Sequence, residues 1–157
     1  MSLRNRLLLR WMSLYPPFLG AGVRVRVAAR APYVFDVRLK LRWWNRNYVG
    51  TQFGGALYTM CDPFYMLILI DALGRDFLVW DKAATIRFRR PGRGAVSARF
   101  EIAPERIDEI RREATAAGRA EPRFTARVVD TAGEIVAEVE KVISVRPHPS
   151  ASAAHSG

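Results

Sequence analysis

Residues 55–73 read GALYTMCDPFYMLILIDAL, and this stretch decides the fold. Apolar side chains fall on nearly every side of a helix drawn through it, which is typical of a helix buried in a protein core. Its nineteen residues span roughly 28 Å at about 1.5 Å each, the width of a small domain. Gly74 follows as a helix stop. The stretch therefore predicts one long central helix.

Segments on both sides of this helix alternate apolar and polar residues, as half-buried strands do. Two of them precede the helix and are joined by a turn at Ala31–Pro32, and a polar, glycine-bearing loop over 43–55 leads into the helix. A charged helix with a thin apolar stripe is expected between the later strands. The expected elements are strands 23–30, 33–42, 77–90, 95–102, 123–130 and 134–145, and helices 1–15 and 104–117.

The length of 157 residues favours one domain. We expect it over 1–146, with helix 1–15 packed on it and ending at Pro16–Pro17, and with a disordered tail over 147–157. The element order predicts an α+β fold in which an antiparallel sheet wraps around the central helix. This arrangement suggests the hotdog fold.

Composition restricts the chemistry. Cys61 is the only cysteine, and both histidines, His148 and His155, lie in the tail. We therefore expect no metal site, no Ser-His-Asp triad and no Cys-His pair in the folded body, and we interpret Cys61 as a small buried hydrophobe. Carboxylates, amides, hydroxyls and backbone groups remain for any reaction.

The net charge of +10 is concentrated near the N-terminus. Residues 1–46 hold ten lysines and arginines against one acid, a net charge of +9, whereas the remainder holds 15 basic and 14 acidic side chains, a net charge of +1. The basic residues alternate with apolar ones, as on the solvated face of a strand. Binding of nucleic acid stays a remote alternative, because no nucleic-acid motif accompanies the charge.

No segment predicts a membrane span. The most apolar run, 64–70, lies between Asp62 and Asp71 and is far shorter than the roughly 20 residues that a bilayer requires. The run Leu7–Leu9 is too short for a signal peptide. We expect a soluble cytoplasmic protein.

The segment NYVGTQFGG, residues 47–55, opens into the central helix. A helix start exposes unpaired N–H groups with a partial positive charge, and glycines let a ligand carbonyl come close to them. Gly54 and Gly55 are therefore candidate donors of an oxyanion site. Turn geometry alone, with Asn47 as a turn or cap residue, also explains the loop.

Asp62 lies among apolar residues of the central helix, directly before Pro63. A carboxylate there needs a partner or a hydrated cavity, and such an acid suits general acid–base chemistry. Because proline removes one helical hydrogen bond, we expect a kink beside the acid. A structural role, in which Asp62 bonds a backbone group at the helix break, stays open.

Basic residues near the third strand form a weaker candidate, a rim that binds phosphate groups. The alternative is a solvated strand face followed by an ordinary turn. The candidate residues are Lys82, Arg89 and Arg90.

Together these motifs resemble the phenylacetyl-CoA-thioesterase-like branch of the hotdog superfamily. That branch typically reads Asn-x-x-Gly-x-x-His-Gly-Gly, with an acid nine positions after the histidine. The chain matches this spacing from Asn47 to Asp62, with Phe53 in the place of the histidine. A longer set of segments is similar to a bacterial hotdog subfamily known mainly as a domain of unknown function; these are 45–47, 53–55, 62–65 and 79–82.

The resemblance implies a hydrolase of acyl-CoA or acyl-carrier-protein thioesters, with no cofactor besides the coenzyme A of its substrate. It implies that the carbonyl binds at Gly54 and Gly55, and that Asn47 positions the thioester or a water. Asp62 would act from the partner subunit as general base or nucleophile, and the basic strand would meet the coenzyme A phosphates. It also implies a homodimer whose sheets join edge to edge, and which can pair into a tetramer.

Phe53 cannot donate the hydrogen bond of the histidine that it replaces, although Thr51 or Gln52 could substitute. We count all three as candidate substrate-binding residues. A second hypothesis is therefore a non-catalytic hotdog module that binds an acylated or hydrophobic ligand.

Overall fold

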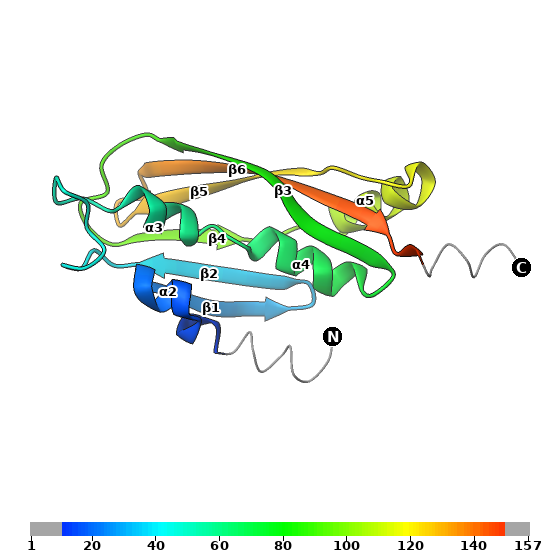
Figure 1. The fold of residues 1–157 in the computed structure, drawn as a ribbon, viewed down its shortest axis with the longest axis horizontal. Coiled ribbons are helices and arrows are strands. Elements are labelled where there is room, and N and C mark those ends of the chain that lie inside the picture. Colours follow the sequence, from blue (N-terminus) through cyan, green and yellow to red (C-terminus); the bar gives the residue numbers. More distant parts are fainter. Residues whose placement is uncertain (1–10, 150–157) are drawn as a thin grey trace, which may run out of the picture.

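A computed structural model describes residues 11–149, and their strands form one antiparallel sheet in the order β1-β2-β4-β5-β6-β3 (Figure 1). The strands β1 and β3 are its two edges. The strands are β1 (Val23–Arg30), β2 (Tyr33–Leu39), β3 (Phe77–Phe88), β4 (Val96–Phe100), β5 (Arg123–Asp130) and β6 (Ile135–Pro147). The helices are η1 (Met12–Leu14), α2 (Pro16–Ala21), α3 (Gly54–Thr59), α4 (Phe64–Leu73) and α5 (Pro104–Ala117).

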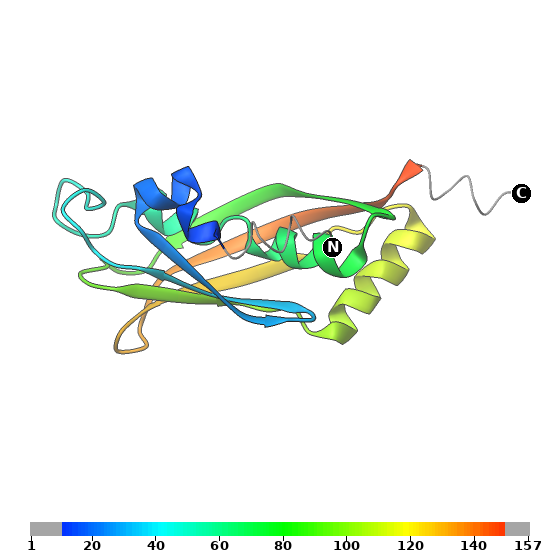
Figure 2. The ribbon, with the colours of Figure 1, turned by 90° about the horizontal axis from the view of Figure 1, so that it is seen from below.

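The central helical segment lies along one face of the sheet, which curves around it (Figure 2). The α+β hotdog fold is thus confirmed. The segment is broken into α3 and α4 at Met60–Pro63, where the N–H groups of Cys61 and Asp62 bond carbonyls only three residues earlier. Proline has no N–H to continue the helix, so the expected kink beside Asp62 is also confirmed. By length and composition this segment could cross a membrane, but half of its apolar window is buried inside the domain.

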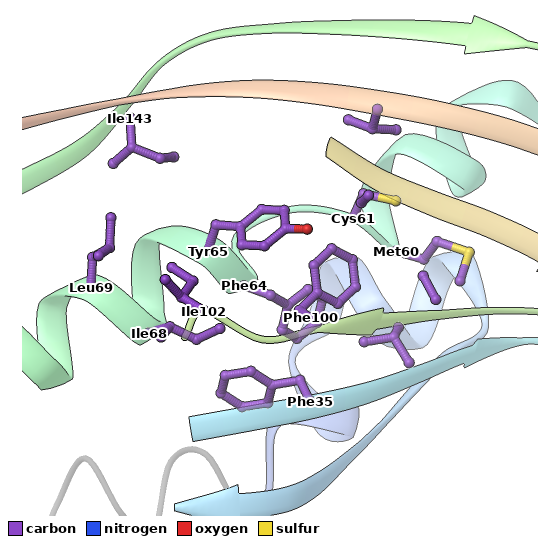
Figure 3. Close-up of a cluster of buried hydrophobic side chains, with 14 of the residues drawn as sticks. Phe35, Met60, Cys61, Phe64, Tyr65, Ile68, Leu69, Phe100, Ile102 and Ile143 are labelled. Atoms are coloured by element: carbon purple, nitrogen blue, oxygen red, sulfur yellow. The ribbon is translucent and has the colours of Figure 1, made fainter. Parts of the chain in front are cut away.

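Aromatic rings fill the space between the helix and the sheet (Figure 3). The centroid of the Phe64 ring on α4 lies 4.7 Å from the ring centroid of Phe100 on β4 and 5.2 Å from that of Phe35 on β2. Tyr65 packs on Phe100 from the next position and donates its hydroxyl to the carbonyl of Thr125 at 3.0 Å. The apolar faces of the strands pack against the all-apolar helix, so the core lies on the concave face of the sheet.

The N-terminal helix differs from the prediction where the structure describes it. Residues 1–10 lie outside the described residues, and the part that follows is a single 3-10 turn, Met12–Leu14. Pro16 and Pro17 begin α2 and do not end an earlier helix. Proline fits the first helical turn because the N–H groups there have no partner within the helix.

The C-terminal strand runs further than predicted. β6 reaches Pro147, which pairs with Phe77, and the N–H of His148 donates to the carbonyl of Asp76 at 2.7 Å. The expected tail therefore cannot start at 147, and its last part, 150–157, lies outside the described residues. The bounds of α5 and β5 agree with the sequence prediction.

Candidate functional site

A cluster of three charged side chains lies at the break in the central helix. The Oδ1 atom of Asp62 is 2.5 Å from the Nζ atom of Lys141 on β6, and the Oδ2 atom of Asp81 on β3 is 3.0 Å from the same nitrogen. The side chain of Lys141 is 1% exposed, that of Asp81 24% and that of Asp62 41%. The cluster thus buries its cation and opens to the surface through Asp62.

The two carboxylates hold Lys141 in its charged form. Burial lowers the pKa of Lys141, but hydrogen bonds and charge attraction from Asp62 and Asp81 outweigh burial and raise the pKa above its ordinary value. Burial also raises the pKa of Asp81, against the opposing effect of Lys141. The phenol oxygen of Tyr58 lies 3.4 Å from Nζ and completes the surroundings of the ammonium group.

The sequence analysis predicted Asp62 as a site residue, but it did not single out Lys141 and assigned no role to Asp81. The sequence contains a signal for Lys141, because this residue takes the place of an apolar one in the alternating pattern Val139, Lys141, Ile143. In the structure all three side chains are buried on the same face of β6. Asp81 lacked such a signal, because its position depends on an irregularity of β3. The pairing with β6 shifts between Asp81 and Ala83, a bulge that redirects side chains in this part of the strand.

Cys61 is adjacent to this cluster and is not reactive. Burial raises the pKa of its thiol to about 12, so the thiolate that a nucleophile needs is scarce at neutral pH. Within residues 11–149, no group of three or more histidine, cysteine or acidic side chains is placed to hold a metal ion.

The loop before α3 is held together by Asn47. Its side-chain oxygen accepts a hydrogen bond from the Thr51 N–H at 2.9 Å, and its amide nitrogen donates to the Thr51 hydroxyl at 2.8 Å. Gln52 is buried and donates to the carbonyl of Gly94 at 2.9 Å, and its own N–H donates to that of Gly92 at 2.8 Å. Asn47, Thr51 and Gln52 therefore shape this loop in the described conformation.

Two exposed aromatic rings flank the start of α3. A Cβ atom built on Gly54 would lie 2.9 Å from the ring of Phe88 at the end of β3, and one built on Gly55 would overlap the ring of Phe53. Phe53 and Phe88 are 55% and 56% exposed. The glycine pair thus lies between two apolar surfaces that a hydrophobic group could contact.

The basic residues proposed for phosphate binding are paired with acids. Lys82 binds both carboxylate oxygens of Glu121 at 2.8 Å, Arg89 binds Glu138 at 2.7 Å, and Arg90 pairs with Glu134. All three basic side chains stay partly exposed. They lie on or just beyond β3, so the structure keeps them at one edge of the sheet.

The structure does not bring the glycine pair and Asp62 together within one chain. Gly54 begins α3 and Asp62 lies in the break beyond its end, so the six residues of α3, roughly 9 Å of helix, separate them. A carbonyl group that is bonded at Gly54 therefore lies out of reach of Asp62 of the same chain.

A separate basic groove of about 780 Å³ lies on the outer face of the sheet, away from the helix and from Asp62. Arg24 and Arg38 face each other there across β1 and β2, and Arg26 and Arg99 share Asp36. Three of the basic residues of the N-terminal third, Arg24, Arg26 and Arg38, thus lie on this solvated strand face.

Comparisons with known proteins agree with this fold. A family model described as "Domain of unknown function (DUF4442)" matches residues 4–145. The solved structure of PA5026 from Pseudomonas aeruginosa, described as a protein of unknown function and "Probable Thioesterase", is 26% identical with a TM-score of 0.79, and the match covers 94% of this chain and 99% of that chain.

Two further solved structures share the fold at low identity. Thioesterase HI1161 from Haemophilus influenzae is 12% identical with a TM-score of 0.64, and the match covers 94% of this chain and 92% of that one. A mutant of thioesterase PA1618 from Pseudomonas aeruginosa is 11% identical with a TM-score of 0.64, covering 94% and 96%. No curated protein sequence matches the chain.

Proposed function

The chain belongs to the DUF4442 family, and from this membership and the hotdog fold we propose that it hydrolyses acyl thioesters. The observation that carries the proposal is the carboxylate of Asp62, which is partly exposed at the helix break and fixed by a buried lysine. A carboxylate that is oriented and open to solvent meets the needs of a general base. The resemblance of the motifs to the phenylacetyl-CoA-thioesterase-like branch supports the same reaction.

In the proposed reaction, Asp62 takes a proton from a water molecule as the water oxygen attacks the thioester carbonyl carbon. A C–O bond forms and the C–S bond breaks. The proton passes to the departing sulfur, which yields a carboxylic acid and a thiol. Backbone N–H groups at Gly54 and Gly55 would bind the developing oxyanion.

The active form in this proposal is a homodimer. Because Gly54 and Asp62 of one chain lie too far apart to share a carbonyl, a site that uses both needs two chains. The edge strand β3 is suited to join them, since no described strand pairs with its outer edge. Asp81 next to Asp62 and Phe88 next to Gly54 come to face each other across two antiparallel β3 strands if the twofold axis passes through Thr85, because the bulge near Asp81 adds one residue on that side of the axis.

We propose acyl-CoA or an acyl carrier protein as the substrate's carrier, in the cytoplasm. Lys82, Arg89 and Arg90 lie along the edge where the two sheets would join, and their partly exposed side chains could exchange carboxylate partners for phosphate groups. The exposed rings of Phe53 and Phe88 beside the glycine pair favour an apolar or aromatic acyl group. Asn47 keeps its implied role of positioning the thioester or a water only if its loop opens on binding.

A second candidate is a hotdog module that binds an acylated ligand without turnover. Two observations favour it. Phe53 occupies the position of the family histidine and offers no hydrogen bond, and the side-chain amide of Asn47 is engaged within its own loop.

Hydrolysis of a panel of acyl-CoA thioesters, from short to long aliphatic and aromatic, tests the proposal. We expect turnover by the unmodified chain and a loss of about a hundredfold or more in Asp62→Asn, since a positioned base contributes roughly that much. Asp71→Asn is the matched control, because it removes an acid from the same helical segment away from the break. Circular dichroism and sedimentation establish that each variant is folded and keeps its oligomeric state.

A rate of hydrolysis in Asp62→Asn equal to that of the unmodified chain would show that this carboxylate takes no part in the reaction. Saturable binding of one acyl-CoA without turnover across the panel would support the binding module.

A further inference from the structure

Lys141 lies at a position where burial of its charged side chain costs free energy. Its side chain is 1% exposed on the core face of β6, between the buried Val139 and Ile143. An ammonium group buried in this way is tolerated only when it is paired and hydrogen-bonded. The chain could satisfy it with one carboxylate, yet it supplies two, Asp62 and Asp81.

The two carboxylates are not equivalent. Asp81 extends from the irregular part of β3, is the more buried of the two, and its Oδ1 atom is buried without a hydrogen-bond partner among the described residues. Asp62 is the more exposed, and its contact with Lys141 is the shorter, at 2.5 Å against 3.0 Å. Asp81 thus anchors the ammonium from inside, while Asp62 presents its carboxylate outward.

Three separate elements meet in this contact. Asp62 comes from the break between α3 and α4, Asp81 from the edge strand β3, and Lys141 from the neighbouring β6. The segment around Asp62 has left regular helical bonding, so the backbone alone leaves its side chain more freedom than a helix interior would. The contact with a rigid sheet residue restricts that freedom.

We propose that Lys141, anchored by Asp81, is the positioning residue that holds the Asp62 carboxylate in its orientation at the helix break. The inference rests on the proposed function for its catalytic meaning, but its physical content concerns only these three side chains. Neither Lys141 nor Asp81 needs to touch the substrate.

The pH dependence gives a distinctive signature. The titratable groups around Asp62 are Lys141 on β6, Asp81 on β3, Tyr58 on α3 and Cys61 at the break. Burial raises the pKa of the Cys61 thiol to about 12, so Cys61 adds no charge near neutral pH, and Lys141 is the cation that faces both carboxylates. Its removal leaves Asp62 and Asp81 close together without a cation between them, which favours protonation of the pair at higher pH.

The test compares Lys141→Met with the unmodified chain by two measurements. Carbon-13 NMR of labelled aspartate follows protonation of the Asp62 carboxyl group directly and needs no activity. The pH profile of kcat/KM for the best acyl-CoA of the panel follows the same event in catalysis. We expect both the NMR midpoint and the acid limb of the profile to move together to higher pH in Lys141→Met, because the cation that faces the carboxylates is gone.

Two further variants control for folding and for general charge effects. The double variant Asp81→Asn/Lys141→Met removes a carboxylate together with the lysine, so it leaves less unpaired charge in the core and serves if Lys141→Met does not fold. We expect the NMR midpoint of Asp62 to move to higher pH in the double variant as well, but by less than in Lys141→Met. Lys40→Met removes an exposed lysine at the end of β2 and should leave both measurements unchanged.

An Asp62 titration that stays in place in folded Lys141→Met or in the double variant would overturn the inference, as would an activity loss that is equal at every pH. If the unmodified chain hydrolyses no thioester, the proposed function fails, and the NMR titration still decides whether Lys141 controls Asp62.

Discussion

The absence of a side chain at position 55 leaves room for the ring of Phe53, which lies where a Cβ atom would be. We therefore expect Gly55→Ala to push the ring away and to destabilise the protein by about 1 kcal/mol, in the range of mild overpacking. In a Phe53→Ala background the same change should cost nothing or stabilise slightly, because alanine suits a helix better than glycine.

Urea unfolding of the two single variants and the double variant measures this coupling. A coupling energy of about 1 kcal/mol is expected for residues in contact. Additive effects of the two substitutions would show that the ring does not occupy this space.

Single residues were predictable only where their neighbours in sequence revealed them. Asp62 is flanked by Met60, Cys61 and Phe64, so its exceptional position is visible locally. Asp81 stands among Trp80 and Lys82, which look like an ordinary solvated strand. Its significance arises from a contact 60 positions away, with Lys141, and no local pattern encodes that contact.

At the scale of elements, β3 is a long edge strand with exposed residues along its centre. If two copies pair about an axis through Thr85, a charge at position 84 lies diagonally across from its own copy on the same face of the sheet. We expect Ala84→Glu to convert the proposed dimer to a monomer and to abolish the proposed hydrolysis, because like charges at diagonal positions of paired strands repel. Sedimentation velocity and the acyl-CoA assay measure the two effects.

Ala29→Glu is the control, since it adds the same charge to the exposed end of β1, the other edge of the sheet. It should leave the oligomeric state and the activity unchanged. A dimer that persists in Ala84→Glu would show that the interface does not lie at the centre of β3.

The bounds of some elements followed from local signals and those of others did not. α5 was predicted over its observed range because proline and glycine limit it and its apolar stripe has helical spacing. The strand predicted to end at 42 ends at Leu39, because the side chain of Asn45 bonds the backbone of Lys40, Arg42 and Ala21 in place of a sheet neighbour. That bonding depends on α2, which the pattern of the strand does not contain.

At the scale of the whole molecule, the uneven charge affects stability. Arg24 faces Arg38 across β1 and β2, whereas Arg26 faces Asp36 two positions further along the same strand. We expect Arg24→Glu to stabilise the protein at low ionic strength by about 0.5–1 kcal/mol, a rise in Tm of roughly 1–4 °C for a chain of this size. Arg26→Glu makes the same change of charge and should lower Tm.

Thermal unfolding at low and high salt checks both variants, and both differences should shrink when salt screens the charges. Equal shifts in the two variants would show that net charge, and not the cross-strand pairing, controls stability. Nucleic-acid binding by the basic N-terminal third remains a remote alternative, which requires a steep salt dependence of DNA or RNA affinity.

The sequence by itself determined the hotdog architecture, because one all-apolar helix among alternating strands has few ways to bury its surface, and local periodicity records that pattern. It also singled out Asp62 and the glycine pair, which stand out against their immediate neighbours. Only the tertiary structure decided that a lysine from the last strand lies against Asp62 and that Asp81 shares this lysine. These are distances between segments far apart along the chain, and they depend on strand order, on a bulge and on a helix break that act together.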